Sequence, residues 1–251
     1  MAFAFAKAEQ AELEEPLIRA ADWTLGMRSK NGGYGAFDVD NTYYYLNEIP
    51  FADHGALLDP PTADVSARCL MLLAKVADKN PAYHAGLRNT IDYLRSEQEA
   101  DGSWFGRWGT NYIYGTWSVL LGLEQTNLPK SDPMYTRAAA WLKSVQRADG
   151  GWGEDNFSYH DSNYRGAYRF STAFQTAWAI LGLIAAGEVH SPEVKSGIEF
   201  LLKAQQADGV WNDKCFTAPG FPRVFYLKYH GYDKFFPLWA LARYRNELSK
   251  K

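Results

Sequence analysis

A short motif that recurs along the chain constrains its fold more than any other feature of the sequence. The motif begins with glutamine, carries Asp-Gly, and ends in tryptophan at Gln98–Trp104, Gln146–Trp152 and Gln205–Trp211. A degenerate copy runs from Arg28 to Tyr34. An aromatic residue stands five positions before each copy, namely Trp23, Tyr93, Trp141 and Phe200. Self-similarity of this kind predicts a repeat fold.

Apolar residues between the motifs follow helical spacing and predict eight helices of two kinds. Four are amphipathic and each leads into a Gln/Trp loop, and they span 14–27, 81–97, 132–145 and 191–204. Four are apolar over most of their circumference and span 62–76, 114–124, 171–186 and 235–248. Thr62 is the expected N-cap of the first apolar helix. This alternation favours an inner and an outer ring of helices.

We therefore predict an all-α fold, an α/α barrel (toroid) of alternating inner and outer helices with almost no strand. Glycine supplies the backbone conformations of the loops, and the glutamine amide can hydrogen-bond the backbone at a helix end. The chain is expected to form a single domain over residues 1–251. With about eight helices the barrel is incomplete, which leaves an apolar edge uncovered. We expect that edge around residues 17–25 and 62–73, with dimerisation or aggregation as its result.

Composition excludes several classes of function. The formal net charge of -3 gives no basic footprint for nucleic acid. Cys69 and Cys215 have no metal-ligand spacing, which favours a reducing compartment and disfavours a zinc site. We expect no signal peptide, and the sequence shows no run of about 18 apolar residues that could span a membrane. No P-loop, dinucleotide fingerprint or nucleophile elbow occurs.

Longer motifs carry a family resemblance from about Leu17 to Tyr244. They read DGSWFGRWG, NYIYGTW, DGGWGED, QTAW, IPFADHGALLDPPTADV and GFPRVFYLKYH. With these motifs the chain resembles the C-terminal part of the squalene-hopene cyclases, a class of triterpene cyclases. The resemblance implies an intramolecular isomerase that cyclises squalene or a related polyprene to hopanoid triterpenes by acid initiation, without metal or organic cofactor. It also implies a cytoplasmic location with peripheral, monotopic attachment to a membrane surface.

The acid that starts such a reaction lies in a D-x-D-D motif, upstream of the segments matched here. Asp38-Val39-Asp40-Asn41 aligns with a different acidic loop, and its carboxylates are expected to cap a turn. The resemblance places Asp64 and Arg68 at positions that support the acid. They stand four residues apart on one helical face, so an ordinary helix salt bridge is the alternative. Some family members carry histidine in place of Arg68.

Aromatic rings supply the other half of the implied mechanism, because their faces stabilise a carbocation. Phe51 and Ala52 match the constriction of the substrate channel, and Phe37 replaces a tyrosine found in some members. His54 stands where some members carry phenylalanine. The full set at cavity-lining or product-shaping positions is Phe37, Phe51, Trp108, Tyr114, Phe221, Phe225, Tyr229 and Tyr232, with Leu227 beside them. Core packing is the alternative for any single ring, and it is expected for Trp104, Trp152 and Trp211.

Two functional hypotheses remain open at this point. In the first, the chain is a catalytic portion that works with an N-terminal cyclase half supplying the D-x-D-D acid, or as a homodimer. In the second, it is a non-catalytic remnant or an α/α domain that binds isoprenoid or protein. Asp149, Glu154 and Asp155 follow one Gln/Trp motif and are interpreted as turn and helix caps under either hypothesis.

Overall fold

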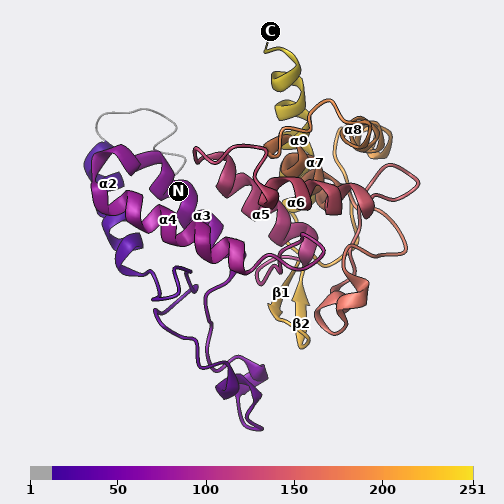
Figure 1. Cartoon of the computed structure of the whole chain (residues 1–251). Coiled ribbons are helices and arrows are strands. Elements are labelled where there is room, and N and C mark those ends of the chain that lie inside the picture. Colours follow the sequence, from indigo (N-terminus) through magenta and orange to yellow (C-terminus); the bar gives the residue numbers. More distant parts are fainter. Residues whose placement is uncertain (1–12, 251) are drawn as a thin grey trace. The chain divides into compact units, whose positions relative to one another are not determined.

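The computed structural model describes residues 13–250, and in that part of the chain it contains eight α-helices (Figure 1). They are α2 (Glu14–Gly26), α3 (Ala63–Val76), α4 (Pro81–Ser96), α5 (Tyr112–Glu124), α6 (Pro133–Ser144), α7 (Ala173–Ala185), α8 (Pro192–Ala204) and α9 (Tyr232–Leu248). Short 3-10 turns are η2 (Tyr44–Glu48), η3 (Asp53–Gly55), η4 (Ala77–Lys79), η5 (Asn156–Tyr159) and η6 (Ser162–Tyr164). The predicted all-α class is confirmed.

One β-hairpin interrupts the helices and was not predicted from the sequence. Strands β1 (Ala218–Phe221) and β2 (Phe225–Leu227) pair antiparallel, with a register shift between Pro219 and Phe221. A Cβ at Gly220 would lie 2.0 Å from the Phe225 ring, so only glycine lets this ring cross the strand. The hairpin therefore forms where a glycine interrupts an aromatic-rich run that has no helical period.

Each Gln/Trp loop folds into the same tight turn. The motif glycines Gly32, Gly102, Gly150 and Gly209 have φ angles of 93°, 99°, 85° and 83°. These values lie in the left-handed region that favours glycine. The Asp or Asn before each glycine accepts a hydrogen bond from the backbone N–H two residues later, at 2.9–3.2 Å. The Asp-Gly pair is thus fixed by turn geometry.

The aromatic residue that ends a loop is bonded to the next apolar helix. The backbone N–H groups of Tyr34, Trp104 and Trp152 donate to hydroxyls of Ser66, Thr116 and Thr176, respectively, at 2.9, 3.0 and 2.9 Å. The indole N–H groups of Trp152 and Trp211 donate to the Leu142 and Leu201 carbonyls. Trp104, Trp152 and Trp211 are buried, which confirms their predicted packing role.

The glutamine of the motif also makes the kind of bond expected of it. The side-chain amides of Gln146 and Gln205 donate to the carbonyls of Gly150 and Gly209, at 2.8 and 2.7 Å. Gln146 in addition donates to the Glu193 carbonyl in the first turn of α8, at 2.9 Å. The amide therefore closes the turn, and in the third loop it joins that turn to the following outer helix.

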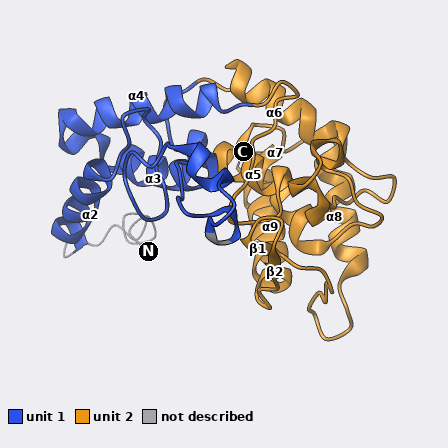
Figure 2. Cartoon of the chain, turned by 90° about the horizontal axis from the view of Figure 1, so that it is seen from below, with its two compact units in different colours: residues 1–98, 121–128 blue, residues 99–120, 129–251 orange. Residues whose placement is uncertain are grey.

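The chain divides into two compact units, which are described separately (Figure 2). Unit 1 comprises residues 1–98 and 121–128, and unit 2 comprises residues 99–120 and 129–251. A single domain over residues 1–251 stays a prediction. In unit 1, α3 packs against α2 and α4. Its core cluster contains Ala21, Tyr34, Leu73, Val76 and Tyr83.

The expected apolar edge around residues 17–25 and 62–73 is wrong for most of these residues. Leu17, Leu70 and Leu73 are buried, because α2 and α3 cover each other and enclose a second small cluster of Leu17 with Leu72. Trp23 is the exception, with 67% of its surface exposed on α2. The uncovered apolar surface on this side is therefore one indole ring rather than two helix faces.

Unit 2 is built around α7, whose thirteen residues are all buried. The helix packs against α6, α8 and α9 (Figure 1). The outer helices α6 and α8 instead alternate buried and exposed residues. The predicted alternation of apolar and amphipathic helices is confirmed from α5 to α8. It is not confirmed for α9, in which only Asp233, Pro237 and Ala240 are buried.

Acidic side chains from the loops cap the apolar helices of unit 2. The Glu154 carboxylate accepts hydrogen bonds from the backbone N–H groups of Asn111, Tyr112 and Ile113, at 2.9–3.3 Å. Asp213 likewise accepts from the N–H groups of Ala173 and Phe174. Because of this distant cap, α5 begins at Tyr112, two residues before the predicted start at Tyr114. Burial raises the pKa of both carboxyl groups.

The cap interpretation is confirmed for the other two acids. Asp149 accepts hydrogen bonds from the Gly151 N–H and the Ser171 hydroxyl, and Asp155 accepts from the Phe157 N–H. By contrast, Thr62 holds the predicted N-cap position of α3, but its side chain makes no hydrogen bond to the helix backbone there. The position of this cap was predicted correctly and its hydrogen bond was not. The Thr62 hydroxyl donates to Asp64 at 2.6 Å instead.

We predict that Glu154→Ala lowers the free energy of unfolding by about 3 kcal/mol, because buried amides lose their acceptor. Denaturant unfolding followed by circular dichroism measures the change. Glu199→Ala removes an exposed carboxylate from α8 and should change stability by less than about 0.5 kcal/mol. Equal effects of the two substitutions would contradict a capping role for Glu154.

Candidate functional site

Unit 2 gathers aromatic rings around Trp178 of α7. The rings of Tyr114, Phe236 and Tyr232 meet it edge-on, with centroid distances of 5.1, 5.4 and 5.9 Å. Tyr229 stacks on Tyr232 at 5.0 Å. Edge-to-face and offset pairs at these distances are favourable arrangements. Three of the predicted ring residues, Tyr114, Tyr229 and Tyr232, therefore belong to one cluster.

The glycines that follow the Gln98–Trp104 motif make room for one ring of this cluster. A Cβ at Gly109 would lie 2.5 Å from carbons of the Tyr114 ring, and one at Gly106 would lie 2.8 Å from it. Tyr114 is buried between them, at the start of the helix that Glu154 caps. The loop is thus glycine-rich at these positions because its backbone lies directly against an aromatic face.

Arg107 joins Trp108 to the hairpin. Its guanidinium carbon lies 4.3 Å from the centroid of the Trp108 ring, and both terminal nitrogens donate to the Gly220 carbonyl at 3.4 Å. On the hairpin, the rings of Phe221 and Phe225 meet edge-on at 5.5 Å. Three more predicted residues are thus tied to one local structure, and Phe225 remains 42% exposed.

Leu227 and Tyr229 continue this surface. The Leu227 carbonyl accepts a hydrogen bond from the Thr217 N–H at 2.8 Å, and the Tyr229 N–H donates to the Thr217 hydroxyl. Their side chains are exposed, as is that of Phe225. The hairpin and the chain after it therefore present apolar side chains outward. Because Phe225, Leu227 and Tyr229 are exposed, packing in the core, the alternative to a cavity-lining role, does not explain them.

The predicted residues of unit 1 lie on an extended segment and on α3. Phe51 is 84% exposed, Phe37 and His54 are also exposed, and Ala52 is half-buried. Asn47 closes the base of the segment through two hydrogen bonds with the Leu58 backbone. Figure 1 shows η2 and η3 extending away from α2, α3 and α4. Among residues 13–250, no helix has the length and apolar run needed to cross a bilayer.

Asp64 is 1% exposed in the first turn of α3, whereas Arg68 is exposed. The Asp64 carboxylate accepts hydrogen bonds from the Thr62 hydroxyl and the Val65 N–H, at 2.6 and 3.1 Å. Ser66 and Thr116 make the same bond to a loop aromatic, so they hold equivalent positions in the repeat. Two residues before them stand Asp64 and Tyr114. A carboxylate in α3 thus takes the repeat position that carries a ring in α5.

In the acidic loop, Asp40 lies in a bend and its carboxylate holds the backbone, as predicted, whereas a cap by Asp38 stays a prediction. Asp40 has a φ of 55° and accepts a hydrogen bond from the Lys30 N–H at 2.8 Å. The Lys30 ammonium lies 3.3 Å from the same carboxylate. The backbone hydrogen bond, with the nearby ammonium, lowers the pKa of Asp40. The Asp40 carboxylate is thus engaged with the Lys30 backbone and ammonium, in agreement with a structural role in the loop.

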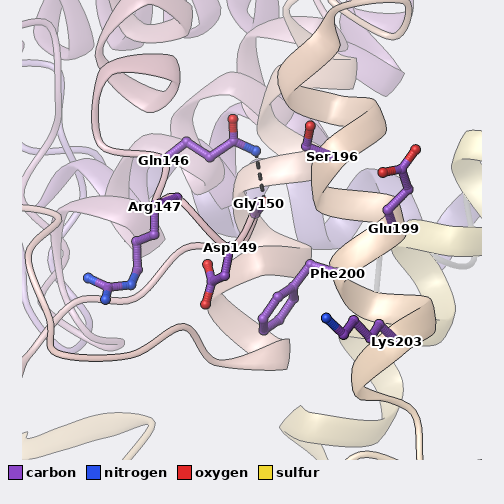
Figure 3. A pocket seen from close by; sticks show the side chains of 9 residues that line it. Gln146, Arg147, Asp149, Gly150, Ser196, Glu199, Phe200 and Lys203 are labelled. Atoms are coloured by element: carbon purple, nitrogen blue, oxygen red, sulfur yellow. Dashed lines mark hydrogen bonds between the residues drawn. The ribbon is translucent and has the colours of Figure 1, made fainter.

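A separate pocket lies between the third Gln/Trp loop and α8 (Figure 3). Its volume is about 350 Å³, and Arg147, Asp149, Glu199 and Lys203 line it. None of the residues predicted for the site lies in it. Its charged lining does not suit an apolar chain molecule.

The sequence interpretation missed the residues that hold the predicted ones together. Trp178 and Phe236 link the rings of unit 2, and Arg107 links Trp108 to the hairpin. Trp178 stands in QTAW, a motif that carried the family resemblance, but the motif assigned it no role. A helical position fully enclosed by other rings looks, in sequence, like any core residue.

The fold is similar to that of two solved proteins. The ent-copalyl diphosphate synthase from Streptomyces platensis superposes with a TM-score of 0.63 and 24% identity, covering 88% of this chain and 37% of that one. A possible GH105-family member from Klebsiella pneumoniae gives a TM-score of 0.68 at 15% identity, covering 98% and 69%. At these identities the likeness bears on the fold alone. Together with the helix alternation it identifies an α/α toroid architecture.

Sequence comparison gives the family. Residues 1–246 match the family described as Squalene-hopene cyclase C-terminal domain. A probable squalene-hopene cyclase of Sinorhizobium fredii is 56% identical over 94% of this chain and 36% of its own length. The squalene-hopene cyclase of Zymomonas mobilis is 55% identical, covering 94% and 35%. The chain belongs to the squalene-hopene cyclase family, and it spans about a third of the length of these relatives.

We predict that Gly109→Ala displaces the Tyr114 ring and destabilises the chain by about 1–3 kcal/mol, because the new methyl group overpacks this contact. Thermal unfolding and the near-ultraviolet circular dichroism of the aromatic cluster measure the two effects. Gly26→Ala is the matched control, since no atom of the described residues lies within 4 Å of a Cβ there. An unchanged near-ultraviolet spectrum in Gly109→Ala would refute the ring-spacing role of this glycine.

Proposed function

We propose that this chain forms the C-terminal part of a squalene-hopene cyclase, in which it supplies cation-stabilising rings and support for the initiating acid. The observation that carries this proposal is the cluster around Trp178, which joins three rings selected from the resemblance alone. Membership of the family supports the same reaction class. Squalene, the substrate in the names of the relatives, is a polyene that such rings suit.

In the proposed mechanism, a carboxylic acid starts the reaction and the aromatic rings that line the cavity stabilise the cation. A strong carboxylic acid in the remainder of the enzyme, in the D-x-D-D motif, adds a proton to the terminal alkene. Arg68 of α3 carries the positive charge that stabilises the conjugate base of that acid, and Asp64, four residues earlier on the same helical face, supports Arg68. The rings of Trp108 and Phe225 present their faces to the cation as bonds form. A final proton loss gives the polycyclic alkene, so no cofactor is consumed.

The second hypothesis is a binding domain without turnover. Rings stabilise a cation only once it exists. A ring-lined surface without an initiating acid therefore binds a polyprene but does not convert it. We expect residues 1–251 alone to bind squalene weakly and to form no detectable hopene. The two hypotheses therefore separate when an acid-bearing segment is added.

We predict that a chimera becomes active when this chain replaces the matching third of the Zymomonas mobilis cyclase. Gas chromatography with mass spectrometry of squalene incubations detects the cyclised product. The same exchange with the corresponding segment of the Sinorhizobium fredii relative controls for the junction. An active control beside an inactive chimera would reject the cyclase proposal in favour of the binding domain.

Variants within the active chimera separate the two roles. Asp64→Asn should reduce product formation at least about a hundredfold, as expected when support for a proton donor is lost. Trp108→Ala and Phe225→Ala should instead release partly cyclised products, because the cation loses a stabilising face. Phe157→Ala removes a ring of similar exposure outside the proposed wall and should leave the product unchanged. Partly cyclised products from the Phe157 variant alone would contradict the assignment.

We further propose that the segment around η2 and η3 attaches the protein to a membrane surface. Tyr43, Tyr44, Tyr45, Phe51 and Leu57 are all exposed on it. Aromatic rings of this kind suit the boundary between headgroups and acyl chains. The attachment would allow a polyprene to be taken up from lipid.

We predict that Phe51→Ser reduces binding of the chain to phosphatidylcholine vesicles several-fold, because a nearly fully exposed ring is lost. Vesicle flotation measures the bound fraction. Trp23→Ser is the matched control, since it removes an exposed ring from α2 of the same unit. If both variants bind as the wild type does, the segment is not the attachment surface.

A further inference from the structure

The loop that carries Trp108 is held by side chains of η5, the short helix that follows the third Gln/Trp motif. The side-chain oxygen of Asn156 accepts a hydrogen bond from the Thr110 hydroxyl at 2.5 Å. The Ser158 hydroxyl accepts one from the side-chain amide of Asn111 at 3.1 Å. The chain after one motif therefore holds the chain after the preceding motif, at positions two and three residues beyond the indole.

Tyr159, the last residue of η5, contacts the loop on both sides of Trp108. Its hydroxyl lies 2.7 Å from the carbonyl oxygen of Gly106 and 2.7 Å from that of Gly109. A phenol has one proton to donate, so the two backbone acceptors share one donor. Because both carbonyls converge on one atom, the chain between them is bent, and Trp108 lies in this bend.

The loop by itself does little to place the indole of Trp108. The two glycines that flank the Arg-Trp pair have no Cβ, so their backbone angles are less restricted than those of other residues. Arg107 supplies one restraint through its bonds to the Gly220 carbonyl, but at 3.4 Å these are long for hydrogen bonds. The shorter contacts of the Tyr159 hydroxyl are therefore the stronger restraint on the bend.

The ring of Tyr159 is held by contacts that do not involve its hydroxyl. It meets the Phe105 ring edge-on at 5.7 Å and lies against the Tyr226 ring at 6.1 Å. The Tyr226 hydroxyl in turn donates to the Asn156 carbonyl at 3.4 Å. These contacts place the phenol where its oxygen reaches both carbonyls. A substitution that removes the hydroxyl alone leaves them in place.

We propose that Tyr159 is a positioning residue for Trp108, because its hydroxyl fixes the bend that directs the indole. This inference deepens the proposed function and rests on it, since Trp108 stabilises the cation there. A ring attracts a cation that lies over its face, within about 6 Å of its centroid. Even a displacement of about 1 Å can impair a reaction that depends on such placement. Tyr159 thus acts through Trp108 and not by contact with the substrate.

A purely structural role is the alternative for Tyr159. Loss of a phenol hydrogen bond lowers stability wherever the bond lies in the fold. Under this alternative the position of Trp108 does not depend on the hydroxyl. The two roles therefore predict a similar loss of stability and differ in the position of one indole ring.

The test is Tyr159→Phe, which removes the hydroxyl and keeps the ring. Fluorine NMR of the chain labelled with 5-fluorotryptophan reports on each indole, and Trp108→Phe assigns the Trp108 resonance. We expect this resonance to shift by more than its linewidth in Tyr159→Phe. The resonances of Trp152 and Trp211, which are buried in other loops, should stay in place.

Tyr83→Phe is the matched control. The Tyr83 hydroxyl donates to Asp22 at 2.7 Å, so this variant loses one phenol hydrogen bond in unit 1, outside the loop that carries Trp108. Both variants should lower the unfolding temperature by a few degrees. Only Tyr159→Phe should shift the Trp108 resonance.

The chimera with the Zymomonas mobilis segment tests the consequence for the reaction. Tyr159→Phe should raise the fraction of partly cyclised products at least about threefold, whereas Tyr83→Phe should leave the product mixture unchanged. A Trp108 resonance that does not shift would overturn the proposal, and so would a slower Tyr159→Phe chimera with an unchanged product mixture. An inactive chimera beside a shifted resonance would refute the proposed function and still support the placement of Trp108 by Tyr159.

Discussion

The register of this repeat structure depends on a hydrogen bond from the backbone N–H of a loop aromatic to a hydroxyl on the next apolar helix. Ser66, Thr116 and Thr176 accept it in turn. Each bond is buried, so its loss would leave an unsatisfied amide in the interior. It fixes where a loop ends relative to the helix that follows. Everything that projects from the first turn of that helix, including Asp64 and Tyr114, is placed by it.

Local sequence was sufficient to predict the helices and turns. Apolar spacing marked the eight helices, and Asp-Gly marked turns whose φ angles only glycine adopts readily. Features set by distant residues were not predictable in this way. The start of α5 depends on Glu154, which belongs to the next loop, and the β-hairpin depends on how closely Gly220 approaches the Phe225 ring. The covered faces of α2 and α3 likewise follow from their mutual packing.

In the candidate site, too, the individual residues could be predicted from the sequence, whereas the contacts between them could not. The resemblance selected Tyr114, Tyr229 and Tyr232 one position at a time, and it could not show that a buried tryptophan holds them together. Arg107 escaped notice because an arginine between aromatic residues has no helical or strand pattern of its own. Its role depends on a carbonyl more than a hundred residues away in the chain. The site is therefore formed by contacts between pairs of residues, and the identity of a single residue in the sequence does not reveal such contacts.

The carboxylates two residues after Trp152 and Trp211, which end the third and fourth loops, have a consequence for the electrostatic potential. The N-terminus of a helix carries about half a positive charge, which would repel a carbocation held near the first turns of α5 and α7. Glu154 and Asp213 lie on those helix ends. Burial raises the pKa of both groups, but in their ionised form these carboxylates offset the positive end of each helix dipole. The residues that define where these helices begin also remove a field that would oppose the chemistry proposed for the rings beside them.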